Sequence, residues 1–176
     1  MVSSMRFFSF ILFSVFFIYA HELYAKDEKR IIVGYIENIT IPNIDAKYKA
    51  KLDTGAKTSS IHANIIEISK AEEGSDEKGY VLFSLEKEDG ELTQIKKDIE
   101  RMVKIKKKDG GVQERPTIVM TFCIADTLIK EEVNLADREH FKYDVLVGRN
   151  MLKKALFIVD VSKKFTTRAQ CKSKNN

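Results

Sequence analysis

The sequence has few of the residues that build disulfide scaffolds, metal sites and nucleotide-binding loops. Its 176 residues include two cysteines, two prolines and no tryptophan. The cysteines, Cys123 and Cys171, do not have the spacing of metal ligands. No Gly-x-x-x-x-Gly-Lys-(Ser/Thr) loop is present to bind the phosphates of ATP, and no His-Glu-x-x-His segment is present to bind zinc. We therefore expect no ATP site, no zinc site and no other cofactor.

The chain also has little excess of one charge over the other. The chain has 30 basic and 26 acidic residues, which gives a formal net charge of +4 at pH 7. A local basic cluster, residues 105–111, ends in Asp-Gly-Gly and is typical of a solvated hairpin. Nothing in the sequence resembles a nucleic-acid-binding fingerprint, so we expect no nucleic-acid partner.

A long apolar run occurs at the N-terminus. Residues 7–20 are apolar apart from two serines, and a basic residue precedes them. This pattern is typical of a secretory signal peptide, cleaved after Ala25 or, as a second choice, after Ala20. The run is shorter than the ~20 residues that a spanning helix needs, and an uncleaved membrane anchor is the alternative. We expect a signal peptide at 1–25, the only contact with a membrane, then one domain at 26–166 and a basic polar tail at 167–176.

Helical periodicity is almost absent from the rest of the chain. Residues 149–155 predict one short helix. The other segments are rich in β-branched residues or alternate in polarity, with turn residues between them. We expect strands at 30–41, 47–53, 62–69, 127–137, 142–148 and 156–161, and hairpins at 79–97 and 101–124. This pattern predicts an all-β fold, a small sandwich or barrel.

Two segments could carry chemistry. In Lys51–Ser60, "KLDTGAKTSS", alternation brings the carboxylate of Asp53 to the end of a buried strand. Thr54 adds a hydroxyl, and Gly55 lets another backbone or a substrate approach closely. In Tyr143–Asn150, "YDVLVGRN", three apolar residues lead into a glycine and a short helix.

Together these segments resemble the retropepsin-like aspartic peptidases. The chain is most similar to a bacterial family of retropepsin-like aspartic endopeptidases, also labelled ATP-dependent zinc proteases. The matching residues are Lys51–Ser59, His62–Ala63, Arg115–Pro116, Asp137–Arg138 and Leu146–Asn150. The resemblance covers residues 32–161, and it implies a small closed barrel of the acid-protease type. With the signal segment, it also implies export to the periplasm.

The resemblance implies that Asp53 is the catalytic acid and that Thr54, Gly55, Ala56, Gly148 and Arg149 support its loop. Hydrolysis by this chemistry needs two carboxylates that share one proton, and the chain has one Asp-Thr-Gly. We therefore expect a homodimer that brings two copies of Asp53 together, with the Thr54 hydroxyls joining the two loops.

Further residues are candidates for the substrate cleft. Retroviral relatives carry an acid where this chain has Lys57, so we expect a preference for acidic peptides or proteins. His62 either lines the cleft or is a structural histidine. The family covers its substrate with a β-hairpin, for which we favour the turn at Asp109–Gly111, with Gly110 and Gly111 against the substrate. The turn at Asp89-Gly90 is the alternative.

Several residues receive structural interpretations. We expect Asp137 and Arg138 to form an ion pair, with substrate contact as the alternative, and Arg115 to lie at a strand edge or flap base. Because Lys57 replaces an acid, Arg149 needs another acidic partner, Asp137 or Asp144. An exported chain could pair its cysteines, but the apolar surroundings of Cys123 favour a buried, unpaired thiol.

Two other functions remain open at this point. One is a catalytically inactive module that binds an extended peptide by strand addition on the same fold. The other is a metal-dependent hydrolase that uses His62, His140 and a carboxylate such as Asp53, although these residues lack paired-ligand spacing.

Overall fold

The computed structural model describes residues 29–71, 78–106 and 110–171, so the predicted signal peptide lies outside the described residues. The described part is mostly strand, with one short α-helix. Its elements are β1 (Ile31–Ile41), η2 (Pro42–Ile44), β2 (Ala46–Leu52), β3 (Ser59–His62), β4 (Asn64–Ser69), β5 (Tyr80–Glu86), β6 (Leu92–Asp98), β7 (Arg101–Lys106), β8 (Val112–Ile124), β9 (Thr127–Ala136), β10 (Val145–Val147), α2 (Arg149–Lys154) and β11 (Phe157–Lys164). The all-β prediction is therefore confirmed. Within these ranges no helix is long and apolar enough to cross a membrane.

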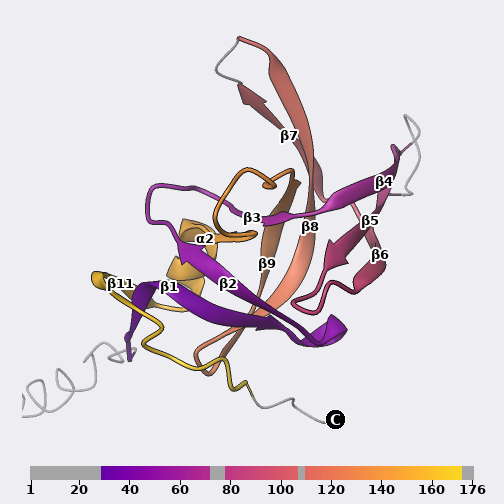
Figure 1. The fold of residues 1–176 in the computed structure, drawn as a ribbon. Coiled ribbons are helices and arrows are strands. Elements are labelled where there is room, and N and C mark those ends of the chain that lie inside the picture. Colours follow the sequence, from indigo (N-terminus) through magenta and orange to yellow (C-terminus); the bar gives the residue numbers. More distant parts are fainter. Residues whose placement is uncertain (1–28, 72–77, 107–109, 172–176) are drawn as a thin grey trace, which may run out of the picture.

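Eight strands form one mixed sheet in the order β11-β1-β2-β10-β3-β9-β8-β7. β1 also pairs with β8, where Ile39 lies opposite Ile124 and Thr40 lies opposite Cys123. The strands β1, β2, β10, β3, β9 and β8 therefore pair in a ring. β11 lies at one edge of this sheet, beside β1. β7 and the first part of β8 extend away from the body of the molecule as a hairpin (Figure 1).

The remaining strands, β4, β5 and β6, form a separate antiparallel sheet beside the ring (Figure 1). Its β5–β6 hairpin turns at Asp89-Gly90, as the sequence predicts, and Gly90 has a φ of +83° that suits glycine. The inner face of β5 contributes Val81, Phe83 and Leu85 to the core. The second sheet therefore covers apolar surface of the first.

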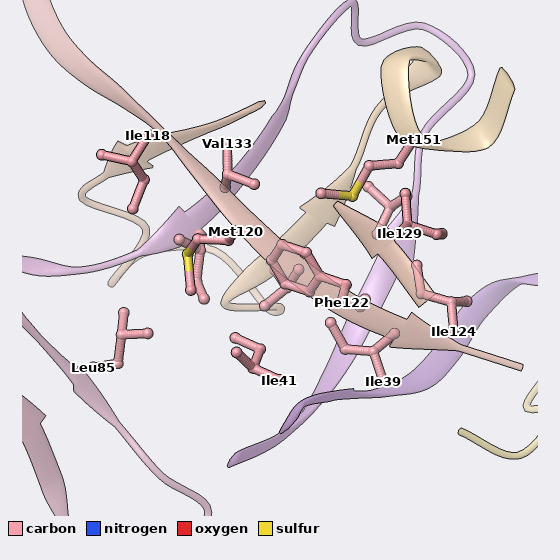
Figure 2. Packing of buried hydrophobic residues seen from close by; sticks show 14 of the residues in the cluster. Ile39, Ile41, Leu85, Ile118, Met120, Phe122, Ile124, Ile129, Val133 and Met151 are labelled. Carbon is pink, nitrogen blue, oxygen red and sulfur yellow. The ribbon is translucent and has the colours of Figure 1, made fainter. Parts of the chain in front are cut away.

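The core lies inside the ring, where alternate residues of each strand meet. Phe122 of β8 is fully buried and lies among Ile39, Ile129 and Met151 (Figure 2). Met151 comes from α2, so the helix closes one side of the core rather than lying free on the surface. Truncating a buried phenylalanine typically costs about 3–5 kcal/mol, so this cluster is a main source of stability.

The predicted strand at 62–69 is two strands that belong to different sheets. β3 ends at His62, and the amide of Ala63 donates to the carbonyl oxygen of Ala136 (3.1 Å) before β4 begins at Asn64. The sequence pattern missed the start of β3 because Ser59 and Ser60 are polar. Both serines are buried, and their hydroxyl groups make hydrogen bonds described below.

The prediction of an unpaired Cys123 is wrong. Cys123 is buried near the end of β8, as expected, but it forms a disulfide with Cys171. The segment before Cys171 folds back over this strand end, where the amide of Gln170 donates to the carbonyl oxygen of Ala125 (2.7 Å). Burial therefore did not isolate the thiol, because the polar C-terminal segment packs against it.

Candidate active site

The two predicted motif segments lie side by side. β2 and β10 pair in parallel, with Leu52 opposite Val147, and the amide of Asp53 donates to the carbonyl oxygen of Val147 (2.8 Å). Both Leu52 and Val147 are buried. The apolar strand β10 thus fixes the point at which Asp53 leaves the sheet.

The Asp53 carboxylate is oriented by its own loop. Oδ1 accepts the backbone amides of Gly55 (2.8 Å) and Ala56 (3.3 Å), while Oδ2 lies 3.8 Å from Nζ of Lys51. A Cβ on residue 55 would lie 3.1 Å from Oδ1, so Gly55 permits this tight turn. The Asp53 side chain is 28% exposed, which leaves it accessible to water.

Arg149 binds the backbone carbonyl oxygens of the Asp53 loop. Its Nη1 donates to the carbonyl oxygens of Thr54 (3.1 Å) and Gly55 (2.9 Å), and its backbone amide donates to the carbonyl oxygen of Ala56 (2.9 Å). The prediction that Arg149 pairs with Asp137 or Asp144 is wrong, since no ion pair joins it to an acid in the described part. Two carbonyl oxygens serve as acceptors instead, so the loop needs no acid in place of Lys57.

Behind the loop, β3, β10 and α2 meet in a compact hydrogen-bond network. Oδ1 of Asn150 accepts the amide (3.0 Å) and hydroxyl (2.9 Å) of Ser59, and its Nδ2 donates to the carbonyl oxygen of Glu132 (2.8 Å). The Ser59 Oγ accepts the amide of Gly148 (2.9 Å). A Cβ on residue 148 would lie 2.7 Å from the carbonyl carbon of Thr58, so only glycine fits there. The motif matching included both Ser59 and Asn150, but nothing in the sequence pattern indicated that they contact each other.

Arg138 does not form the predicted ion pair with Asp137. Its Nη1 donates to Oγ of Ser60 and its Nε to the carbonyl oxygen of Tyr143, both at 3.1 Å, and its guanidinium lies 4.7 Å from the ring centre of Phe141. Burial first, and then the charge of Arg115, hold the pKa of Arg138 below its ordinary value, whereas Asp144 and Asp53 act in the opposite direction.

His62 lies at the opposite end of β3 from the Asp53 loop. Its amide donates to the carbonyl oxygen of Asp144 (2.7 Å), and its Nδ1 accepts the amide of Arg138 (2.8 Å). The Asp137 carboxylate accepts the amide of Glu139 (3.0 Å) and lies 3.9 Å from Nδ1 of His62. These contacts give His62 a structural role in holding the segment after β9.

The other candidate residues are dispersed. Lys57 is exposed in the loop, and His140 is exposed in the turn before β10. Gly110 and Gly111 lie near the tip of the β7–β8 hairpin, beside residues outside the described ranges. Over the described ranges, no three His, Cys, Asp or Glu residues are grouped so that they could hold a metal ion.

A hollow of about 700 Å³ lies away from the Asp53 loop. It is lined by Tyr48 of β2, the Lys142–Asp144 segment and Arg168, among others. Burial first, and then the charges of Asp144 and Glu86, raise the pKa of Tyr48 to about 12, so its hydroxyl stays neutral and donates to the carbonyl oxygen of Glu86 (3.0 Å). Asp53 does not line this hollow.

Comparisons with known proteins agree with this geometry. A solved structure of a Legionella pneumophila protein of unknown function is 29% identical, with a TM-score of 0.66, and covers 80% of this chain and 100% of that one. Two proteins named probable alpha-L-glutamate ligase, from Shewanella halifaxensis and Shewanella pealeana, are each 26% identical over 139 residues, or 78% of this chain. The chain spans 30% of the length of these two relatives. A family model described as "RimB-like: Retropepsin-like aspartic endopeptidase RimB" matches residues 32–170. The chain therefore belongs to the RimB-like family of retropepsin-like aspartic endopeptidases.

Proposed function

We propose that the chain is an exported, periplasmic aspartic endopeptidase that works as a homodimer without a cofactor. The observation that carries the proposal is the Asp53 loop. One carboxylate oxygen is fixed by two backbone amides, and the side chain remains 28% exposed at the end of a buried strand. The six strands that pair in a ring are consistent with the small closed barrel of the acid proteases.

The proposed chemistry needs two such carboxylates in contact. Two carboxylates in direct contact cannot both be ionised, because their negative charges repel, so the pair holds one proton. The ionised Asp53 removes a proton from water as the water oxygen attacks the peptide carbonyl carbon, and the protonated Asp53 stabilises the developing oxyanion. When the C–N bond breaks, the departing nitrogen takes a proton from the pair, which restores the starting state.

The geometry of the loop supports this pairing. The Asp53 loop has Thr54 and Gly55 exposed, so a second copy can approach it. Arg149 and Asn150 fix the loop from behind, which positions the carboxylate before substrate binds. We propose that the two Thr54 hydroxyl groups hydrogen-bond across the dimer axis.

We further propose that the substrate is a peptide or protein with acidic residues. Lys51 and Lys57 are both exposed beside Asp53, and cations favour carboxylates nearby. The relatives named alpha-L-glutamate ligase contain a domain like this chain within a longer protein. A peptidase domain joined to a glutamate-adding enzyme is expected to act on glutamate-bearing chains.

Replacement of Asp53 by asparagine tests the proposed function. Asp53→Asn keeps the shape of the loop but removes the ionisable group, so we expect cleavage of a glutamate-rich peptide to fall by about 10³-fold or more. Asp126→Asn, in the exposed turn between β8 and β9, is the matched control and should keep the wild-type rate. The measurement is the initial rate of peptide cleavage by the purified mature chain, with products identified by mass spectrometry.

Three outcomes would contradict the proposal. Full activity in Asp53→Asn would remove Asp53 from the chemistry. Activity that is abolished by a chelator, and unaffected by pepstatin-type inhibitors, would instead indicate a metal-dependent hydrolase. A wild-type chain that binds the peptide tightly and never cleaves it would be a peptide-binding module.

A further inference from the structure

The separate sheet has one edge strand that lacks the usual protection against pairing. β4 pairs only with β5 among the described strands, so its other edge leaves backbone N–H and C=O groups open. Lysine or proline commonly protects such an edge. The edge strand β6 carries Lys96 and Lys97, and the edge strand β7 carries Lys104 and Lys106. β4 carries neither lysine nor proline, so it is open to a further strand.

The apolar face of this sheet continues past the surface that the ring covers. Ile65 lies opposite Phe83, which is fully buried, yet Ile65 is 42% exposed. Ile68 lies opposite the fully buried Val81 and is 37% exposed. Residues directly opposite each other share a face of a sheet, so both isoleucines lie on the face that packs against the core. A strand added beside β4 would cover the exposed part of both.

A hollow of about 340 Å³ lies at the start of this open edge. Asn64 and Ile65 line one part of it, and Gln113–Arg115 of β8 line another. Figure 1 shows β4 as the strand of the separate sheet nearest the β7–β8 hairpin, and an ion pair between Lys70 and Glu114 (3.8 Å) agrees. The hollow has the space of roughly ten waters at ~30 Å³ each, which is enough for one long side chain. A segment paired with β4 would place a side chain there.

The charge of the hollow indicates which side chain would suit it. Three acidic residues, Glu114, Asp137 and Glu139, line it beside one arginine, Arg115. Two lysines already lie 3.8 Å from Glu114. Over the described ranges, neither Asp137 nor Glu139 forms an ion pair with a lysine or arginine. Because these two carboxylates outweigh the single charge of Arg115, the hollow favours a cationic side chain.

We propose that the open edge of β4 is a docking site for an extended segment of a partner protein. The segment adds to the separate sheet as a fourth strand, covers Ile65 and Ile68 with its apolar residues, and places a lysine or arginine in the acidic hollow. Main-chain pairing supplies affinity in this mode of binding, and the side chains supply specificity. The site goes beyond the proposed function, since the region around Lys51 and Lys57 is proposed to favour acidic peptides instead.

A peptide of this chemistry tests the docking site. The probe is a fluorescent peptide of alternating valine and threonine with two lysines at one end, titrated with the purified mature chain and followed by anisotropy. It is made with the lysines at either terminus, because an open edge accepts a strand in either direction. We expect saturable binding of at least one version, and about threefold weaker binding when glutamine replaces its lysines. No saturable binding of either version would overturn the site, and so would equal affinity with glutamine.

Removal of backbone donors from the peptide tests strand addition itself. N-methyl groups on every second residue block pairing along one edge of the peptide, and the alternate set blocks the other edge. We expect at least one set to weaken binding by about tenfold or more, because the loss of one hydrogen bond typically costs about fivefold. Equal affinity of the unmodified peptide and both methylated peptides would show that no strand is added, and the proposal would fall.

Two protein variants locate the binding site. Ile65→Thr keeps a β-branched side chain but removes apolar contact, and Glu139→Gln removes one carboxylate of the hollow. Each should weaken binding of the lysine peptide by about threefold or more. Leu92→Thr, on the exposed leucine of the opposite edge strand β6, and Glu88→Gln, in the exposed β5–β6 turn, are the matched controls and should bind as wild type does. Wild-type affinity in either Ile65→Thr or Glu139→Gln would overturn the site.

Two further measurements exclude other occupants of this edge. Asp53→Asn should bind the lysine peptide as tightly as wild type, because Asp53 does not line the hollow, and a loss would place the peptide in the catalytic cleft instead. Ile66→Lys puts a charge on the same edge and should leave the mass in analytical ultracentrifugation unchanged. A change from dimer to monomer would assign the edge to a second copy of the chain and overturn the docking site.

The experiments also separate this inference from the proposed function. If the lysine peptide binds as described but no glutamate-rich peptide is cleaved, the docking site stands and the peptidase proposal fails. If glutamate-rich peptides are cleaved and the lysine peptide does not bind, the peptidase proposal stands and the docking site fails.

Discussion

At the scale of single residues, Glu37 is a buried polar group that the sequence pattern did not point to. Its side chain is fully buried on β1 and accepts the amides of Gly34 (2.6 Å), Thr166 (2.9 Å) and Thr167 (3.1 Å) and the hydroxyls of both threonines (2.6 and 3.0 Å). Burial raises the pKa of Glu37, but these hydrogen bonds outweigh it and hold the pKa below its ordinary value of 4.5. The ionised carboxylate therefore anchors the segment after β11.

Glu37→Gln should lower the free energy of unfolding at pH 7 by on the order of 3 kcal/mol, because an amide –NH₂ would face donors. A lowered pKa stabilises the fold at pH values above the unfolded pKa, and this contribution is lost as pH falls through the folded value. The difference between wild type and variant should therefore shrink from pH 7 to pH 3, as measured by urea unfolding. The exposed Glu88→Gln is the control, and an equal loss there, or a pH-independent difference, would contradict the assignment.

At the scale of elements, the position of α2 depends on Gly148. Its φ of −91° is ordinary, so the requirement for glycine is steric: a Cβ would lie 2.7 Å from the carbonyl carbon and 2.9 Å from the carbonyl oxygen of Thr58. Gly148→Ala should cost about 1–3 kcal/mol and displace the helix from the Asp53 loop, so peptide cleavage should fall as well. Urea unfolding and cleavage rates measure the two effects. Lys153→Ala, in the same helix, should change neither, and a fully stable, active Gly148→Ala would show that the loop tolerates the shift.

The sequence predicted those elements whose local pattern agrees with their tertiary surroundings. β-Branched residues correctly gave β1, and alternation and turn residues gave β2 and the two hairpins. The apolar run before Gly148 gave β10, and the segment after it gave α2. β3 was missed because its first residues, Ser59 and Ser60, bury hydroxyl groups against partners from distant segments. The disulfide, the partners of Arg149 and the surroundings of Arg138 were missed for the same reason, since each depends on long-range contacts that no local pattern encodes.

At the scale of the whole molecule, one edge of the main sheet is the place where we expect a second copy. β11 pairs only with β1 among the described strands, so its other edge leaves backbone groups open. Ile32 and Ile158 lie opposite each other across these two strands and are 60% and 45% exposed. An apolar pair beside an open strand edge is suited to an isologous contact with another copy of the chain.

Ile158→Glu should therefore convert the protein from dimer to monomer and remove cleavage, because each chain supplies only one Asp53. Analytical ultracentrifugation measures the change in mass, and the wild-type specific activity should itself fall on dilution, since the proposed active species is a dimer. Leu92→Glu places the same charge on an exposed leucine of β6, 56% exposed in the other sheet, and should leave both mass and activity unchanged. A monomeric Ile158→Glu that cleaves peptide at the wild-type rate would mean that one Asp53 is sufficient, and the paired-carboxylate mechanism would have to be abandoned.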